Sequence, residues 1–128
     1  MSDPEHDAWA YELANEWIAG WNSGDLDRIL AHYSDDFEMR SPLIAARGFA
    51  PSGVLRGKPA IRLYWAAGLA TAKPPLHFEL IDVYVGANTV AIHYTSVGRK
   101  RVVEVLEVDA ARRVIRGSAC YGPDAEPA

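Results

Sequence analysis

The carboxylate most able to do chemistry in this sequence is Glu104, which stands in an otherwise apolar run of a predicted strand. Side chains of a strand alternate between its two faces, so Glu104 and Leu106 share one face and Glu107 lies on the other. Because Glu107 is the better candidate for the solvent-facing carboxylate, we expect Glu104 to be buried. Burial raises the pKa of a carboxyl, so Glu104 would be a hydrogen-bond donor or general acid near neutral pH. The alternative is a carboxylate at an exposed edge, or one paired with Arg116.

Aromatic side chains gather on the inward faces of the predicted helices. The sequence has four tryptophans and six tyrosines, and five of these fall on such faces: Trp17, Trp21, Tyr33, Tyr64 and Trp65. For any one of them, a place in the core is the plainer interpretation. Their polar atoms need partners when buried, however, and several such rings facing a sheet are typical of a ligand cavity. We therefore predict a pocket whose walls include Trp21, Phe37, Met39, Tyr64, Trp65 and Tyr121.

Other polar residues give weaker signals. The four histidines lack the spacing of a metal site, and the glycines lack that of a phosphate loop, so we expect no metal and no cofactor. The pair Asp35–Asp36 stands between a helix and a strand, which favours a turn over paired catalytic carboxylates. Arg40 and Arg56 flank a long segment, and one of them could approach an anionic ligand group at the pocket mouth.

Composition and charge narrow the class of protein. The 17 acidic residues outnumber the 13 basic ones, and the net charge of −4 argues against nucleic-acid binding, which needs a basic face. No apolar run approaches the roughly 18 residues of a membrane span, and the acidic N-terminus does not resemble a signal peptide. The single cysteine, Cys120, excludes an internal disulfide and is typical of a reduced, cytoplasmic compartment.

The periodicity of apolar residues predicts helices in the first half of the chain. One helix runs from Pro4 through Trp21, and a third begins at Gly57. Between them, a second helix carries on one face the residues Leu26, Ile29, Leu30 and Tyr33. A short strand at 37–42 precedes a long loop, 43–56, which would form the movable mouth of the pocket.

The second half of the chain is rich in β-branched and aromatic residues. Short turns separate four predicted strands, so we expect an antiparallel meander over 76–85, 89–97, 101–108 and 114–121. Helices followed by an antiparallel sheet make an α+β domain. We assign residues 1–122 to this single domain and 123–128 to a C-terminal tail.

Several segments, in this order and spacing, resemble the nuclear-transport-factor-2-like superfamily, in its branch of ketosteroid isomerases and SnoaL-like polyketide cyclases. They are WIAGWNSGDLD at 17–27, YSDDF at 33–37, Ser41–Pro42, GKPAIRLYW at 57–65, VEVLEVD at 103–109 and the strand at 114–121. The resemblance implies a cystatin-like, cone-shaped α+β barrel. In it, three helices pack on a curved, mostly antiparallel sheet around a deep apolar pocket. It also implies a homodimer formed through the outer sheet face.

The resemblance assigns roles to individual positions. The general-base aspartate of ketosteroid isomerases corresponds to Ser41, whose hydroxyl cannot take a proton from carbon at neutral pH. The tyrosine that donates to the oxyanion corresponds to Trp17. Two further tyrosines support that donor in the family: one is retained here as Tyr33, and the other is replaced by Trp65. The second donor, a carboxylic acid kept protonated in an apolar site, corresponds to Glu104. A true ketosteroid isomerase is therefore not expected.

We predict a small-molecule-binding protein that, if it is an enzyme, performs cofactor-independent acid–base catalysis on a compact apolar substrate. Glu104 would be the acid, assisted by the Trp17 N–H and the Tyr33 O–H, and Ser41 and Leu106 would join the pocket walls. Isomerisation and cyclisation are the reactions favoured. Two alternatives stay open: a ligand-binding or interaction module without catalysis, and a dimeric structural domain whose own aromatics fill the cavity.

Overall fold

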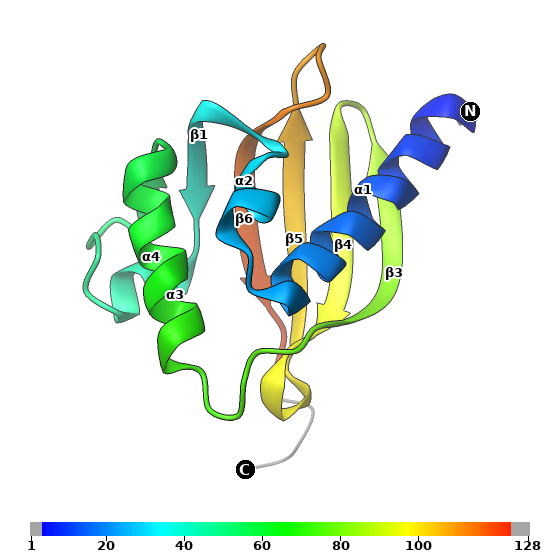
Figure 1. Ribbon diagram of the computed structural model, residues 1–128. Helices are drawn as coiled ribbons and strands as arrows, with labels where there is room; N and C mark the ends of the chain where they lie inside the picture. Colours follow the sequence, from blue (N-terminus) through cyan, green and yellow to red (C-terminus); the bar gives the residue numbers. More distant parts are fainter. Residues whose placement is uncertain (1–3, 124–128) are drawn as a thin grey trace.

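The structure of the chain, a computed structural model, describes residues 4–123 (Figure 1). The predicted tail at 123–128 lies, except for Pro123, outside the described residues, as do the first three residues of the predicted domain. Within residues 4–123, no helix is long and apolar enough to cross a membrane.

Two longer helices and two short ones make up the helical part of the fold. The longer pair are α1 (Pro4–Ser23) and α4 (Lys58–Thr71), and the short pair are α2 (Leu26–Leu30) and α3 (Pro42–Ala46). In α1, spacings of three and four residues bring Ala10, Leu13, Ala14 and Trp17 to one buried stripe. The helices at 4–23 and 58–71 agree with the sequence prediction.

Six strands form one curved sheet. They are β1 (Tyr33–Arg40), β2 (Val54–Arg56), β3 (Glu79–Gly86), β4 (Thr89–Thr95), β5 (Arg101–Val108) and β6 (Val114–Tyr121), in the order β2-β1-β6-β5-β4-β3. All neighbours are antiparallel except β1 and β6, which are parallel. The sheet is open, with β2 and β3 as its edges, so the barrel that the resemblance implied does not close.

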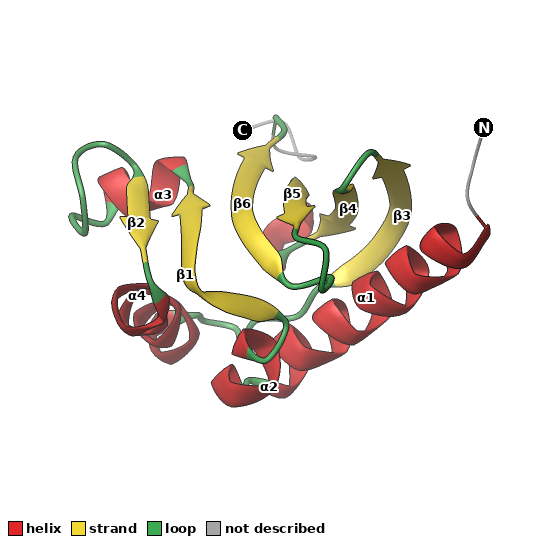
Figure 2. Ribbon diagram, turned by 90° about the horizontal axis from the view of Figure 1, so that it is seen from above, coloured by secondary structure: helices red, strands yellow, loops and turns green. Residues whose placement is uncertain are grey.

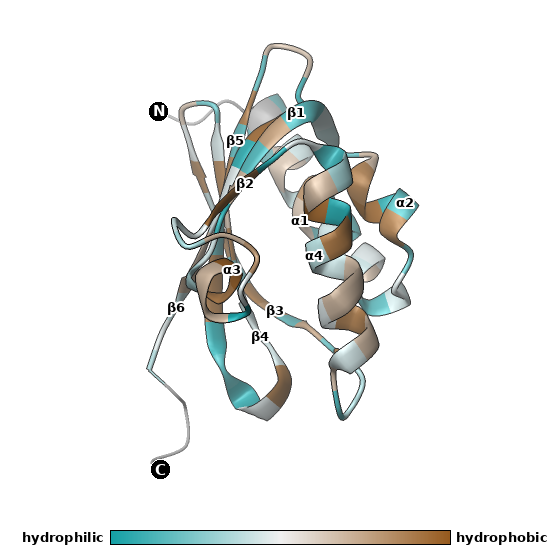
Figure 3. Cartoon of the chain, turned by 90° about the vertical axis from the view of Figure 1, so that its left-hand side faces the viewer, coloured by the Kyte–Doolittle hydropathy of each residue, from teal (hydrophilic) through white to brown (hydrophobic). Residues whose placement is uncertain are grey.

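The helices α1, α2 and α4 lie on one side of this sheet, as Figure 2 shows from above and Figure 3 shows from the side. Burial alternates along β5, where Val102, Glu104, Leu106 and Val108 face inward. The predicted α+β class, with three helices on a curved and mostly antiparallel sheet, is confirmed. The core lies between the helices and the inner face of the sheet.

Two sequence predictions about local structure were wrong. Tyr33 was expected on the second helix, but α2 ends at Leu30 and Tyr33 begins β1, where it pairs with Val114 of β6. A helix of one turn has little stability of its own, so the parallel strand pairing takes over the residues that follow. The segment 43–56 was expected to be a loop, yet it contains most of α3 and all of β2, which pairs with the end of β1.

The signal for α3 was present in the sequence. Ser41 is the N-cap, and its hydroxyl accepts a hydrogen bond from the backbone N–H of Leu43 at 3.2 Å, while Pro42 occupies the first helical turn. Serine followed by proline is a typical helix start.

Candidate active site

A cavity of about 380 Å³ lies between the helices and the inner face of β4, β5 and β6. Its volume is toward the lower end of the range for ligand pockets, about 300–1,000 Å³. The side chains around it that were predicted from the sequence are Trp17, Trp21, Met39, Ser41, Tyr64, Trp65, Glu104 and Tyr121. The purely structural alternative required the aromatics of the chain to fill this space. They do not fill it completely.

Glu104 lies on the inner face of β5, between Ile92 of β4 and Ala119 of β6 in the sheet register. Only 5% of its surface is exposed, so the prediction that it shares the buried face with Leu106 is confirmed. The Tyr94 hydroxyl donates to Glu104 Oε1 across a long 3.4 Å. Burial raises the pKa of Glu104 to about 8, and the Tyr94 hydrogen bond only partly opposes that rise. Near neutral pH, Glu104 is therefore mostly a neutral acid that can donate a proton.

The alternative pairing of Glu104 with Arg116 is wrong. Arg116 contacts two other carboxylates: Nη1 lies 2.6 Å from Glu107 Oε2, and Nε lies 3.5 Å from Glu38 Oε2. Alternation along the strands sends these groups to the outer face of the sheet. Among residues 4–123, Glu104 thus has no cationic partner of the kind that would stabilise its charged form.

Three hydroxyl groups meet on another part of the cavity wall. They come from Ser41 at the end of β1, Tyr64 of α4 and Tyr121 at the end of β6. Burial raises the pKa of both phenols, that of Tyr121 to about 12, and hydrogen bonding to Ser41 opposes the rise in each. All three groups are neutral near pH 7, so this corner offers hydrogen bonds and no ionised base.

Ser41 is also committed to the backbone. Its hydroxyl oxygen accepts the helix-capping bond from Leu43, and its own N–H donates to the Gly53 carbonyl at 3.0 Å. The described residues that line the cavity include no imidazole and one carboxyl, that of Glu104, which is itself mostly protonated near neutral pH and is therefore a poor base for Ser41. The position that corresponds to the catalytic base of ketosteroid isomerases therefore holds a structural cap.

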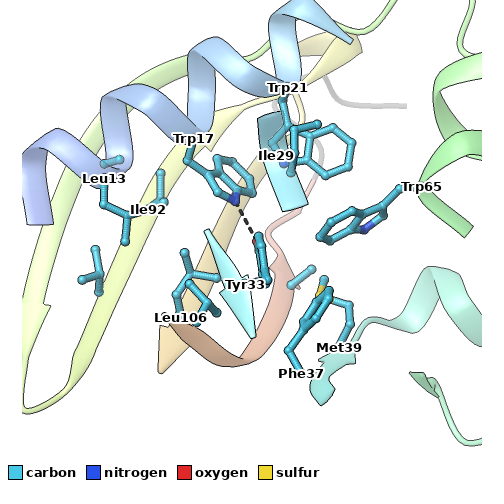
Figure 4. Close-up of a cluster of buried hydrophobic side chains, with 14 of the residues drawn as sticks. Leu13, Trp17, Trp21, Ile29, Tyr33, Phe37, Met39, Trp65, Ile92 and Leu106 are labelled. Atoms are coloured by element: carbon cyan, nitrogen blue, oxygen red, sulfur yellow. Dashed lines mark hydrogen bonds between the residues drawn. The ribbon is translucent and has the colours of Figure 1, made fainter. Parts of the chain in front are cut away.

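Trp17 and Tyr33 form a buried pair beside the cavity. The Trp17 Nε1–H donates to the Tyr33 hydroxyl oxygen at 2.9 Å, the bond drawn as a dashed line in Figure 4. Burial, and then the nearby Glu104, raise the pKa of Tyr33 well above its ordinary value. Trp17 lines the cavity, but its N–H donor is already used by Tyr33, which lies behind the wall.

Trp21 is the other indole of α1 in the wall, and its buried Nε1–H has no acceptor within residues 4–123.

Two other residues predicted for the pocket belong to the core behind it. Phe37 and Leu106 are fully buried, and neither lines the cavity. Phe37 packs against Tyr33 and Trp65, with ring centroids 4.3 and 5.7 Å away. Phe37 and Leu106 pack behind the cavity wall and help to position the residues that line it.

The cationic side chains that line the cavity are not the ones predicted from the sequence. They are Arg47, just after α3, Lys73, just after α4, and Lys100, just before β5. The arginines proposed from the sequence for the pocket mouth lie elsewhere: Arg40 and Arg56 bind the buried Glu38 at 2.8 and 2.6 Å. Glu38 and Arg40 stand on either side of Met39 in β1. Because Met39 lines the cavity, strand alternation places Glu38 and Arg40 on the opposite face of the sheet.

Tyr94 and Arg47 are the functional candidates that sequence reasoning missed. Tyr94 is two residues from the inward-facing Ile92, so the period of the strand was sufficient to find it. Arg47 follows a short helix in a segment without apolar periodicity, and nothing in that pattern indicates where its side chain goes. Phe78, which stacks on Trp17 with ring centroids 5.8 Å apart, precedes the first residue of β3 and was missed for a similar reason.

The arrangement suits proton transfer to a bound carbonyl compound. One buried acid faces the cavity, neutral hydroxyls can hold a second polar group, and aromatic rings can pack against the apolar part of a ligand. Within the described residues, no group of three histidine, cysteine, aspartate or glutamate side chains could hold a metal ion.

Comparison with known proteins identifies the family to which this chain belongs. The model of the SnoaL-like domain matches residues 14–122. A crystal structure of a SnoaL-like protein of unknown function from Burkholderia thailandensis is 43% identical, with a TM-score of 0.86, covering 91% of this chain and 96% of that one.

More distant structures share the fold. A putative ketosteroid isomerase from Kribbella flavida is 16% identical, with a TM-score of 0.67, covering 93% of this chain and 82% of that one. SalBIII is an epoxide hydrolase/cyclase-like enzyme with a role in pyran ring formation in the polyether salinomycin. Its structure is 19% identical, with a TM-score of 0.69, covering 91% of this chain and 92% of that one. The match over most of the chain, together with the close relative, shows that this protein belongs to the SnoaL-like domain family.

Proposed function

We propose that the protein binds a compact small molecule in the cavity and acts on it by acid–base catalysis, with Glu104 as the proton donor. The observation that carries this proposal is the environment of Glu104: a buried carboxyl on the wall of a cavity, with a pKa of about 8. Burying an ionisable group that forms no ion pair has a cost in stability. Placing that group at a cavity gives it a use in chemistry.

Glu104 would give its proton to a carbonyl oxygen and then recover a proton from a carbon or oxygen atom of the same molecule. Such a sequence returns the carboxyl to its starting state and consumes no cofactor. It corresponds to an isomerisation or a cyclisation, in which a proton leaves one atom and arrives at another. The Tyr94 hydroxyl, 3.4 Å from Oε1, would hold the carboxyl while its other oxygen faces the ligand.

The alternative is a binding module of the same fold without catalysis. The observation that favours it is Ser41, which occupies the position of a catalytic base and acts as a helix cap. Among relatives of the same fold, one is named a putative ketosteroid isomerase and another an epoxide hydrolase/cyclase-like enzyme, whereas the more similar relative has no known function. These names are compatible with either proposal.

A proton-exchange experiment separates the two. The protein is incubated in D2O with 2-cyclohexenone, 1-tetralone and 4-acetylbenzoate, and mass spectrometry measures deuterium incorporation next to the carbonyl. Ligand-observed NMR measures binding in the same samples. Glu104→Gln is the test variant, and Glu107→Gln, on the other face of the same strand, is the matched control.

We expect exchange above the buffer rate with the wild type and with Glu107→Gln, and a fall on the order of 100-fold with Glu104→Gln. Binding that persists without any exchange would favour the non-catalytic module. Exchange that is unaffected in Glu104→Gln would remove Glu104 from the mechanism. Failure of every ketone to bind would refute both forms of the proposal.

Two further properties predicted from the sequence also remain proposals. A homodimer would form through the outer face of the sheet, where Ala91, Val103 and Val105 are half-buried in the single chain. A cytoplasmic location would keep Cys120, which is exposed, in its reduced form.

A further inference from the structure

The cavity wall is positively charged although the protein as a whole is negative. The chain carries a net charge of −4, yet the cavity is lined by Arg47, Lys73 and Lys100 and by a single carboxyl, Glu104. A wholly apolar ligand would make no use of the charges of Arg47 and Lys73. The sign of the wall therefore points to a ligand that brings a negative charge.

Arg47 is held in place by the aromatic and glycine residues of α4. Its Cζ lies 5.9 Å from the centre of the Tyr64 ring, a cation–π arrangement. One turn later, Gly68 leaves space for the guanidinium: a Cβ added there would come within 3.2 Å of Arg47 Nη1. Tyr64 and Gly68 are four residues apart and share a face of α4, so together they make a seat for this side chain.

Most arginines in the described chain are neutralised by carboxylates, and Arg47 is not. Ion pairs with aspartate or glutamate form at Arg28, Arg40, Arg56, Arg62, Arg113 and Arg116. Within residues 4–123, no carboxylate pairs with Arg47, and its contacts are with the residues that border the cavity. Arg47 is exposed at the border of the cavity, so its guanidinium, with no carboxylate partner among the described residues, is available to a carboxylate of a ligand.

The hydroxyl corner lies next to this arginine. The charge of Arg47 acts on both Tyr64 and Tyr121, whose hydroxyls meet at Ser41. On the other side, Lys100 Nζ lies 5.9 Å from the centre of the Tyr121 ring. Hydroxyl groups and a guanidinium on one part of the wall can together donate hydrogen bonds to both oxygens of a carboxylate.

We propose that the natural ligand is a keto acid: a compact, largely apolar molecule whose carboxylate binds at Arg47, Tyr64 and Tyr121 while its carbonyl oxygen accepts a hydrogen bond from Glu104. This rests on the proposed function for the carbonyl end and adds the charged end. It adds a carboxylate to the compact apolar substrate that the sequence favoured. The two ends would fix which atoms of the ligand face the acid.

The test compares two ligands that differ only in charge. Isothermal titration calorimetry at pH 7 measures the affinity of 4-acetylbenzoate and of its neutral carboxamide analogue, 4-acetylbenzamide. We expect the wild type to bind the carboxylate at least about tenfold more tightly than the amide, as a charge-assisted bond to arginine implies. Arg47→Gln should abolish this preference, because it weakens binding of the carboxylate far more than binding of the amide. Arg113→Gln, an exposed arginine in the turn before β6, is the matched control.

Equal binding of the two ligands, tighter binding of the amide, or binding of neither would overturn the proposal. So would a preference for the carboxylate that survives Arg47→Gln. Circular dichroism of each variant establishes that it is folded, and Arg47→Lys, which keeps the charge without the planar fork, should retain part of the preference. Proton exchange without a carboxylate preference would refute only this inference, whereas a preference without exchange would refute only the catalytic proposal.

Discussion

The substitution Glu104→Gln should stabilise the protein, and by an amount that grows as the pH rises from weakly acidic to weakly alkaline values. In the unfolded chain, Glu104 ionises with the ordinary pKa of 4.5, whereas in the folded protein its pKa is about 8. Between these values the unfolded state releases a proton that the folded state keeps. The wild type therefore has its full stability below the unfolded pKa and loses it as the pH rises through 8.

The size of the effect follows from the two pKa values. Each pKa unit corresponds to about 1.4 kcal/mol, so the wild type loses about 3.5 kcal/mol between about pH 5 and pH 8 through this group. Glutamine has the same shape, can still accept the Tyr94 hydrogen bond, and does not titrate. A loss of this size is a large share of the roughly 5–15 kcal/mol that stabilises a typical domain.

Urea unfolding of both proteins at half-unit pH intervals measures the prediction. The contributions of all other titrating groups are common to both proteins and cancel in the difference in unfolding free energy. This difference should increase by about 1.2 kcal/mol per pH unit on average across the interval, and by about 1.4 kcal/mol per unit in its middle. A difference that does not change with pH would mean that Glu104 ionises normally, and the reasoning from its burial would be refuted.

Three further predictions concern other groups. Tyr94→Phe removes the hydrogen bond that favours the charged form of Glu104, so it should raise the pKa of Glu104 further and reduce stability by about 1 kcal/mol, measured by NMR titration and urea unfolding. The Arg40 hydrogen bond, with the charges of Arg56 and Arg116, holds the pKa of Glu38 below its ordinary value, so its contribution to stability is present above pH 4.5 and is lost in more acidic solution. Glu38→Gln should therefore be less stable than the wild type at pH 7 and nearly equal to it in strong acid; equal stability at pH 7 would contradict this. Val105→Glu, at the centre of the outer sheet face between Ala91 and Ser118, should convert the proposed dimer to a monomer in light scattering, and a wild type that is already monomeric would refute the dimer.

Regular periodicity made much of this fold predictable. The long stripe of α1 and the alternation along β5 each require a single face to be buried, and this requirement is written in the sequence. The burial of Glu104 followed from the same alternation. The parallel pairing of β1 with β6 was not predictable in this way, because it depends on contacts between segments about 80 residues apart in the chain.

The polar part of the candidate site was harder to predict. Arg40 and Arg56 were as close in sequence to the expected mouth as Arg47, but the buried Glu38 draws the first two to the outer face. Arg47 reaches the cavity because Gly68 and Tyr64 of α4 make room for it, and that seat exists only after α3 and α4 have packed. Long flexible side chains take their positions from tertiary contacts, which local patterns do not record.

The central claim is that Glu104 is a neutral acid facing the cavity under ordinary conditions. Carbon-13 NMR titration of the glutamate side-chain carboxyl carbons, with the Glu104 signal assigned from its loss in Glu104→Gln, measures this most directly. The account predicts a titration midpoint near 8 for this signal, with the carboxyl protonated at pH 6. A midpoint near 4.5 would contradict the account and would remove the proton donor from the proposed chemistry.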